Sequence, residues 1–296
     1  MTYKYLLTIL LTVAIVSPLF GEMINLEDVV AGDVIDNSTV IPDGAVINLN
    51  GGTIASGTIF GAGEFPSGVT LNINDGIVGL GVEINNSTIN IAGGQVALGA
   101  SNLSEGVNNF NNTITVTGGD VGGFFQLRNG STLELVDSTI ESFGILGNSS
   151  ATVTGGAFTL VDNNDILNIF GGNFTSFRTF LTSSVNLFGT EFAIDDVPIS
   201  SLSPDVAFEI LDRNVTLSGT LSDGSTFTNF LDSQTDIDDL DFGPFDSLED
   251  LQSVPGFALS SPDATITVTL VQNVPEPSSF VLFSLASCVF LGRRRR

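Results

Sequence analysis

An internal repeat constrains the fold of this chain more than any other feature. Each copy has two apolar residues separated by one polar residue, then two turn-forming residues that are usually Gly-Gly, and then another apolar residue. The first apolar residues of the copies are Ile47, Leu71, Ile89, Ile114, Leu133, Ala151, Leu167 and Val185. Apolar and polar residues that alternate with a period of two are typical of a strand with one buried face. In most copies Gly or Asn stands three residues before this strand, and both tolerate the positive φ of a tight bend.

The spacing of the copies predicts how the strands are arranged. Successive copies begin about 20 residues apart, which suits one coil of a parallel β-helix, and such coils must stack to bury their apolar faces. We therefore predict an all-β protein whose residues 22–194 form a right-handed parallel β-helix, or solenoid. The alternative is an antiparallel β-sandwich, although its hairpins would recur at about half this spacing. Phe158, Phe174 and Phe192 share one position in later copies, and we predict that they stack inside the core.

The repeat is lost after residue 194. An Asp-Gly pair at 223–224 predicts a hairpin turn, and Ala264–Leu270 alternates apolar and polar residues like a strand. Residues 232–252 between them are rich in carboxylates. Because a solenoid needs atypical ends to cover its open edges, we predict that residues 195–273 form a small β cap with an acidic loop.

The N-terminal 21 residues have the order of parts of a secretory signal peptide. Lys4 is the only charge in the first five residues, residues 6–16 are apolar, and the segment 17–21 looks like a cleavage region that ends at Gly21. A retained membrane helix is the alternative, but the apolar run is shorter than the roughly 20 residues that a span needs. We therefore expect residues 1–21 to be removed on export through the Sec translocon.

The C-terminal residues 274–296 form a second cassette. They open with an extended Pro-Glu-Pro motif, continue with an uncharged segment over 280–291, and end in a basic cluster that favours the cytoplasmic side of a membrane. The motif consists of Val274, Pro275, Glu276 and Pro277, and the cluster consists of Arg293, Arg294, Arg295 and Arg296. A helix over 280–291 would cover about 18 Å, which is too short for a permanent anchor in a hydrocarbon core of roughly 30 Å.

This cassette resembles the PEP-CTERM sorting signal. The resemblance implies an exosortase-like enzyme that cuts near the Pro-Glu-Pro motif and removes the tail. It also implies that the C-terminal helix is a transient inner-membrane anchor. We therefore expect the protein to be exported to the cell surface or to an extracellular matrix, where an extracellular polysaccharide is a candidate partner.

The charge of the chain excludes several classes of function. The formal net charge is −25 at pH 7, and outside the two terminal cassettes the basic residues are Arg128, Arg178 and Arg213. Nucleic acid is excluded as a partner because phosphate binding requires clustered Lys and Arg. The chain has no histidine, which excludes Ser-His-Asp and Cys-His catalysis. Cys288 is the only cysteine and lies in the C-terminal tail, so we expect no disulfide in the mature fold.

The acidic loop is the one candidate metal site. Asp236, Asp238, Asp239 and Asp241, with Asp232 before them, offer the oxygen ligands that calcium prefers. The loop lacks the Gly and the Glu of an EF-hand at the required positions, so a solvated acidic loop is the favoured interpretation. We therefore predict no cofactor and no metal site, with calcium as the alternative.

Two pairs of carboxylates are candidates for glycoside hydrolysis, namely Asp162 with Asp165 and Asp195 with Asp196. Nothing in the sequence sets the separation within either pair, and a chain this acidic shows such pairs on any strand surface. We therefore predict no catalytic residues and an exported, non-catalytic structural or adhesive protein. A carbohydrate-active β-helix enzyme or a carbohydrate-binding protein is the alternative.

Overall fold

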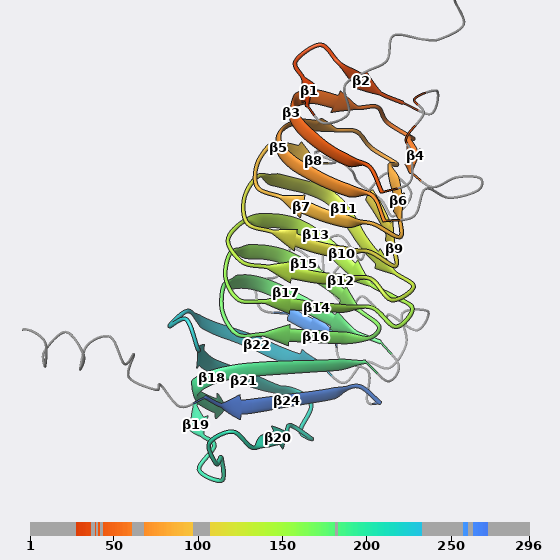
Figure 1. The fold of residues 1–296 in the computed structure, drawn as a ribbon. Coiled ribbons are helices and arrows are strands. Elements are labelled where there is room, and N and C mark those ends of the chain that lie inside the picture. Colours follow the sequence, from red (N-terminus) through yellow and green to blue (C-terminus); the bar gives the residue numbers. More distant parts are fainter. Residues whose placement is uncertain are drawn as a thin grey trace, which may run out of the picture.

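The computed structural model describes residues 28–36, 39, 41, 44–60, 68–96, 107–180, 183–232, 257–259 and 263–271. Within these ranges the regular secondary structure is entirely β, in one hydrogen-bonded sheet with mostly parallel pairings. The prediction of an all-β protein is therefore confirmed. Figure 1 shows the strands stacked one after another along a common axis.

The repeated apolar residues lie on a row of parallel strands that we call the first ladder. Its strands are β3 (Val46–Ile54), β5 (Thr70–Val78), β7 (Thr88–Ile91), β10 (Thr113–Val116), β12 (Thr132–Leu135), β14 (Ser150–Val153), β16 (Ile166–Ile169), β18 (Ser184–Ile194) and β24 (Thr265–Leu270). Equivalent residues of successive copies pair directly, as Leu71 does with Ile89 and Ile89 with Ile114. Because these copies pair in parallel, the antiparallel β-sandwich is wrong for the repeat region.

Two further ladders of parallel strands follow the bends after the first ladder. The second ladder joins the ends of β3 and β5 to β2 (Val34–Ile35), β8 (Gln95–Val96) and the first halves of β11 (Asp120–Arg128), β13 (Thr139–Ile145), β15 (Ala157–Asn163) and β17 (Asn173–Thr179). The third ladder joins β4 (Ile59–Phe60), β6 (Glu83–Asn85), β9 (Val107–Phe110) and the second halves of β11, β13, β15 and β17. β1 (Val29–Val30) pairs with β3 at the N-terminal end.

The core lies between these ladders and runs along the stack. Ile47, Leu71, Val116 and Leu135 are at most 1% exposed, whereas the residues between the repeated apolar positions face outward. Burying apolar surface contributes about 25 cal/mol per Å², so this continuous column of aliphatic side chains is the main source of stability. The predicted alternation of inward and outward residues is therefore confirmed in each of these strands.

The Gly-Gly pairs are explained by two different requirements. A Cβ at Gly155 would lie 2.3 Å from the carbonyl oxygen of Val136 in the preceding strand segment, although the φ of Gly155 is ordinary. Its neighbour Gly156 has a φ of 77°, which side-chain-bearing residues rarely adopt. In this copy the first glycine therefore permits close stacking of neighbouring bends. The second permits the positive φ of the bend and also a close approach, since a Cβ at Gly156 would lie 2.3 Å from the carbonyl oxygen of Ser138.

The C-terminal part combines antiparallel pairings with two parallel ones. It contains β19 (Val197–Pro198), β20 (Ala207–Glu209), β21 (Val215–Leu221), β22 (Thr226–Asp232) and β23 (Phe257–Leu259). The two parallel pairings are β22 with β23 and β18 with β24. β21 and β22 form the antiparallel hairpin predicted around Asp223 and Gly224, and β21 pairs antiparallel with the second half of β18. β24, which we assigned to the cap, instead pairs in parallel with the first half of β18 and extends the first ladder.

The phenylalanine column differs in part from the predicted stack. Phe158 and Phe174 stack with ring centroids 5.3 Å apart, and both are buried. Phe227 of β22, which the repeat pattern does not include, packs against Phe174 at 5.5 Å and Phe192 at 6.3 Å. The hairpin therefore contributes a ring that connects the later members of the column.

Candidate functional site

The residues predicted for processing and for calcium binding lie outside the part of the chain that the structure describes. The processing and sorting residues are Gly21, Val274, Pro275, Glu276, Pro277, Arg293, Arg294, Arg295 and Arg296. The calcium candidates are Asp236, Asp238, Asp239 and Asp241. Asp232 is described, and it is the last residue of β22. In the described ranges no three acidic or cysteine side chains gather closely enough to hold a metal ion.

Asp195 and Asp196 occupy a tight turn between β18 and β19. Both have positive φ values, of 49° and 63°, and the adjoining residues Ile194 and Val197 pair with each other. This is the backbone of a two-residue hairpin turn, where Asp is a favoured residue. The Asp195 carboxylate also accepts a hydrogen bond from the backbone N–H of Thr216 at 2.8 Å. The geometry therefore gives this pair a structural role in the hairpin.

Asp162 and Asp165 have different partners. The Asp165 carboxylate accepts a 3.3 Å hydrogen bond from the backbone N–H of Ser149. Asp162 lies directly opposite Arg178 on the neighbouring strand, and its two oxygens accept hydrogen bonds from Nε and Nη2 of that guanidinium, the latter at 2.6 Å. A carboxylate held by two guanidinium donors is poorly suited to attack a sugar or to transfer a proton.

The Asp162–Arg178 ion pair is largely withdrawn from water. The Arg178 side chain is 9% exposed and the Asp162 side chain 17% exposed, and β22 and β23 lie against β17, which carries Arg178. Burial raises the pKa of the Asp162 carboxyl, and the charge of Arg178 and its hydrogen bonds oppose that rise. Arg178 also approaches the ring of Phe180, with its guanidinium carbon 6.0 Å from the centroid. The pair is a structural contact: two charges that would each be costly to bury alone lie opposite each other on neighbouring strands.

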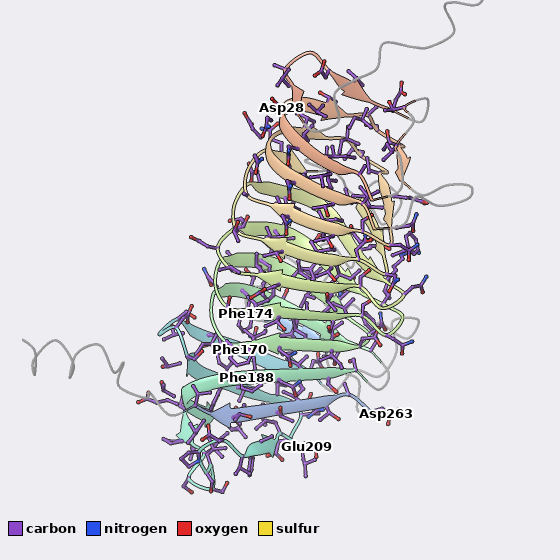
Figure 2. All side chains as sticks on the ribbon, in the orientation of Figure 1. Asp28, Phe170, Phe174, Phe188, Glu209 and Asp263 are labelled. Carbon is purple, nitrogen blue, oxygen red and sulfur yellow. The ribbon has the colours of Figure 1, made fainter. Side chains whose placement is uncertain are left out.

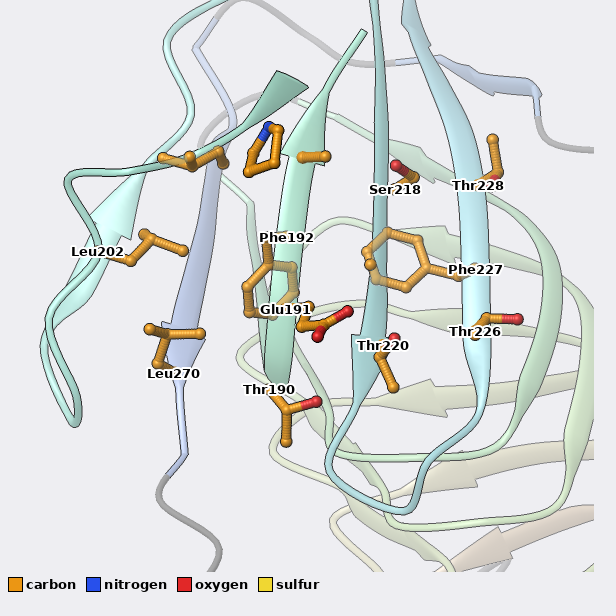
Figure 3. Close-up of a pocket in the computed structure, with 14 residues that line it drawn as sticks. Thr190, Glu191, Phe192, Leu202, Ser218, Thr220, Thr226, Phe227, Thr228 and Leu270 are labelled. Carbon is orange, nitrogen blue, oxygen red and sulfur yellow. The ribbon is translucent and has the colours of Figure 1, made fainter. Parts of the chain in front are cut away.

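An open groove of about 590 Å³ lies on the C-terminal strands, between β18, β21, β22 and the end of β24. Figure 3 shows Phe192 and Phe227 in its floor and Glu191 beside them. Threonine hydroxyls from these strands line much of the rest, and Glu191 is the only ionisable residue among those that line it. Hydrolysis of a glycoside usually needs two carboxylates on either side of the bond. The described lining of the groove has a single carboxylate and so does not supply the acid and base pair of such an enzyme.

Asp223 fastens the β21–β22 hairpin to the stacked bends. Its carboxylate accepts a hydrogen bond from the backbone N–H of Gly172 at 2.6 Å and from the backbone N–H of Ser225 at 2.9 Å. The partly buried position of Asp223 acts to raise its pKa, but the hydrogen bonds from Ser225 and Gly172 outweigh burial and lower the pKa. A Cβ at Gly171 would lie 2.4 Å from this carboxylate, so the glycine makes room for the contact.

We expect Asp223→Ala to lower the free energy of unfolding by about 1 kcal/mol near neutral pH. The backbone N–H groups of Gly172 and Ser225 and the Ser225 hydroxyl lose a charged acceptor, although at a largely solvent-exposed site. A lowered native pKa stabilises the fold above the unfolded pKa, and this contribution is lost as the pH falls through the native value. The difference between wild type and variant should therefore shrink below the ordinary aspartate pKa of 3.8. Urea titrations across this pH range measure it. Asp137→Ala is the control, and an equal pH-dependent difference there would contradict the assignment.

The outward side of the first ladder carries a row of hydrogen-bonded amides. The side-chain N–H of Asn72 donates to Asn48 at 2.8 Å, and that of Asn90 donates to Asn72 at the same distance. Asn186 donates to Asn168 in the same way at 2.9 Å. These asparagines are the polar residues between the two apolar residues of each copy, so the outward row was predictable from the repeat.

A stacked aromatic pair lies beside this row. Phe170 and Phe188 are half-buried on the outward side, with ring centroids 4.0 Å apart and ring planes within 3° of parallel. Figure 2 shows the two rings one above the other at the same end of the first ladder. The contact between them buries part of their apolar surface, and both side chains remain partly exposed.

The comparisons with known proteins add no assignment. The chain matches no family model, no curated protein and no solved structure. A search of the described ranges for membrane spans identifies no helix with the length and apolar character to cross a bilayer.

Proposed function

We propose that this protein is an exported, non-catalytic structural or adhesive component of the cell surface or extracellular matrix. Its repeat region is proposed to be a right-handed parallel β-helix, and the in-register parallel pairing of successive copies supports this arrangement. The observation that carries the functional part is that the paired carboxylates are engaged in turns and in an ion pair. The long stack of strands is then a rigid, anionic spacer.

The route to that location is proposed from the two terminal cassettes of the sequence. Residues 1–21 direct export through the Sec translocon, and residues 274–296 hold the chain transiently in the inner membrane. An exosortase-like enzyme then cuts near Pro275–Pro277 and releases the body to the surface. β24 ends at Leu270, so cleavage at this motif spares every strand that the structure describes.

We expect the mature native protein to begin after Gly21 and to end near the Pro-Glu-Pro motif. Intact mass spectrometry of the protein recovered from the surface of its own host measures both ends.

Neutral residues in place of Arg293–Arg296 should remove the positive-inside retention signal and release unprocessed chain. Arg213 is not a suitable control position, because its guanidinium donates to the backbone carbonyls of Ile210 and Ala264 and its replacement would disturb the fold. Arg128→Gln, outside the cassette, should leave processing unchanged. A dominant surface form that still ends at Arg296 would refute the processing step.

A further inference from the structure

The outward side of the first ladder is a regular polar surface, which we call the Asn/Thr face. It has two columns of side chains that alternate with the buried apolar residues. The first column is Val46, Thr70, Thr88, Thr113, Thr132, Ser150, Ile166, Ser184 and Thr265. The second column is Asn48, Asn72, Asn90, Thr115, Glu134, Thr152, Asn168, Asn186 and Thr267. All of these side chains are half-buried or exposed.

The Asn/Thr face is nearly free of charge in a chain that is otherwise strongly acidic. Glu134 is its only ionisable residue, whereas the chain as a whole has a formal net charge of −25. A polyanion would be repelled by the general field of the protein, and a polycation would find few partners on this face. The charge distribution therefore matches a partner that carries no charge and many hydrogen-bonding groups.

The face is also ordered in advance of any binding. Parallel strands lie about 4.8 Å apart and alternate residues of one strand about 6.6 Å apart, so the two columns form a grid roughly 40 Å long. Asn72 uses one N–H to donate to Asn48 and one oxygen lone pair to accept from Asn90. An amide has two of each, so one donor and one acceptor at Asn72 remain for a partner. Side chains already held in place lose little conformational entropy on binding.

We propose that the Asn/Thr face binds an uncharged polysaccharide whose chain runs along the two columns. Sugar hydroxyls both donate and accept hydrogen bonds, which matches threonine hydroxyls and the remaining amide groups. Phe170 and Phe188 add half-buried apolar rings two residues beyond Asn168 and Asn186 along the chain, and the C–H groups of a sugar pack favourably on apolar rings. This inference rests on the proposed function, because a protein of the extracellular matrix meets polysaccharide as its principal neighbour.

Affinity gel electrophoresis of the processed protein tests the proposal, with hydroxyethyl cellulose as the neutral probe and alginate as the anionic one. The test variant is Thr115→Glu/Thr152→Glu, which places two carboxylates beside Glu134 in the second column. The matched control is Thr139→Glu/Thr159→Glu, at exposed positions of β13 and β15 outside the face. All four positions point outward, so each protein should remain folded, which circular dichroism and urea titration verify.

The wild type and the control should be retarded by hydroxyethyl cellulose, and the test variant should bind at least about tenfold more weakly. Equal retardation of all three proteins, no retardation of the wild type, or retardation by alginate alone would overturn the proposal. Sedimentation that shows self-association lost only in the test variant would instead assign the face to a second copy of the chain. The masses of the mature ends are measured separately, so a failure here leaves the export and processing proposal standing.

Discussion

Val116→Asp is expected to lower the free energy of unfolding by more than about 4 kcal/mol, or to prevent folding altogether. Val116 is fully buried and pairs with Ile91 on one side and Leu135 on the other. An aspartate there would carry an unpaired charge into an apolar column, or would bind a proton at a comparable cost. Urea denaturation of the purified protein measures the loss.

The adjacent residue provides the matched control. Thr115 faces outward in the same strand, and Thr115→Asp should change the free energy of unfolding by only about 0.5 kcal/mol. The same contrast should recur on the next strand between Leu135→Asp and Glu134→Asp, since Leu135 is fully buried and Glu134 is exposed. Similar losses at inward and outward positions would show that the register of the first ladder is incorrect.

Asp162→Ala is expected to destabilise the protein by about 3–5 kcal/mol, because it leaves the nearly buried guanidinium of Arg178 without its carboxylate. The size of the effect comes from the uncompensated charge rather than from the net contribution of the intact pair. Differential urea unfolding of the variant and the wild type near neutral pH measures it.

The double variant Asp162→Leu/Arg178→Met separates these two contributions. It replaces both charges by apolar side chains, so we expect it to be more stable than Asp162→Ala and closer to the wild type. If the double variant loses as much as the sum of the single variants Asp162→Leu and Arg178→Met, the two side chains act independently and the ion pair has no structural role. Asp137→Ala, at an exposed carboxylate of a turn, should change stability little.

Local pattern was sufficient to predict the strands of the first ladder and most of the bends that precede them. Alternation identified the buried residues of the first ladder, and six of the bend positions that precede its strands have positive φ. These six are Gly44, Gly68, Asn86, Asn111, Gly130 and Asn148. Asn164 occupies the equivalent position but does not have positive φ, because this bend has a different hydrogen-bonding pattern. The backbone N–H of Asn164 donates to the carbonyl of Ile145, and the Asn163 side-chain oxygen accepts from the N–H of Asp165.

Contacts between distant segments could not be derived from the local pattern. β24 has the alternation of a repeat strand but lacks the Gly-Gly or similar bend that follows the repeat copies, which is why the sequence places it in the cap. Phe227 and Asp223 reach the stacked bends from a hairpin that has no repeat signal of its own. The processing and calcium candidates lie outside the described residues, and their assignment still depends on the sequence alone.

The Asp162–Arg178 pair was missed although the sequence contained a signal for it. The two residues occupy the same position in successive copies, and residues at equivalent positions pair across parallel ladders. Comparing equivalent positions of successive copies, rather than the residues within each strand, therefore identifies opposite charges that lie next to each other in the fold. The same comparison brings together Asn72 with Asn90 and Phe158 with Phe174.

The pairing of β24 with β18 constrains the order in which the stack can assemble from its N-terminal end. From β3 to β18 each strand of the first ladder pairs with a neighbour only one copy earlier in the chain, so each can add to the stack soon after it emerges. The free edge of β18 is different, because its partner β24 comes much later in the chain. The Thr267 hydroxyl donates to the side chain of Asn186, which lies 81 residues earlier in the sequence. Assembly from the N-terminus therefore halts with one open edge, which closes only when the segment next to the C-terminal cassette arrives. Under the proposed processing route, retention at that cassette gives the chain time to complete this last step before cleavage.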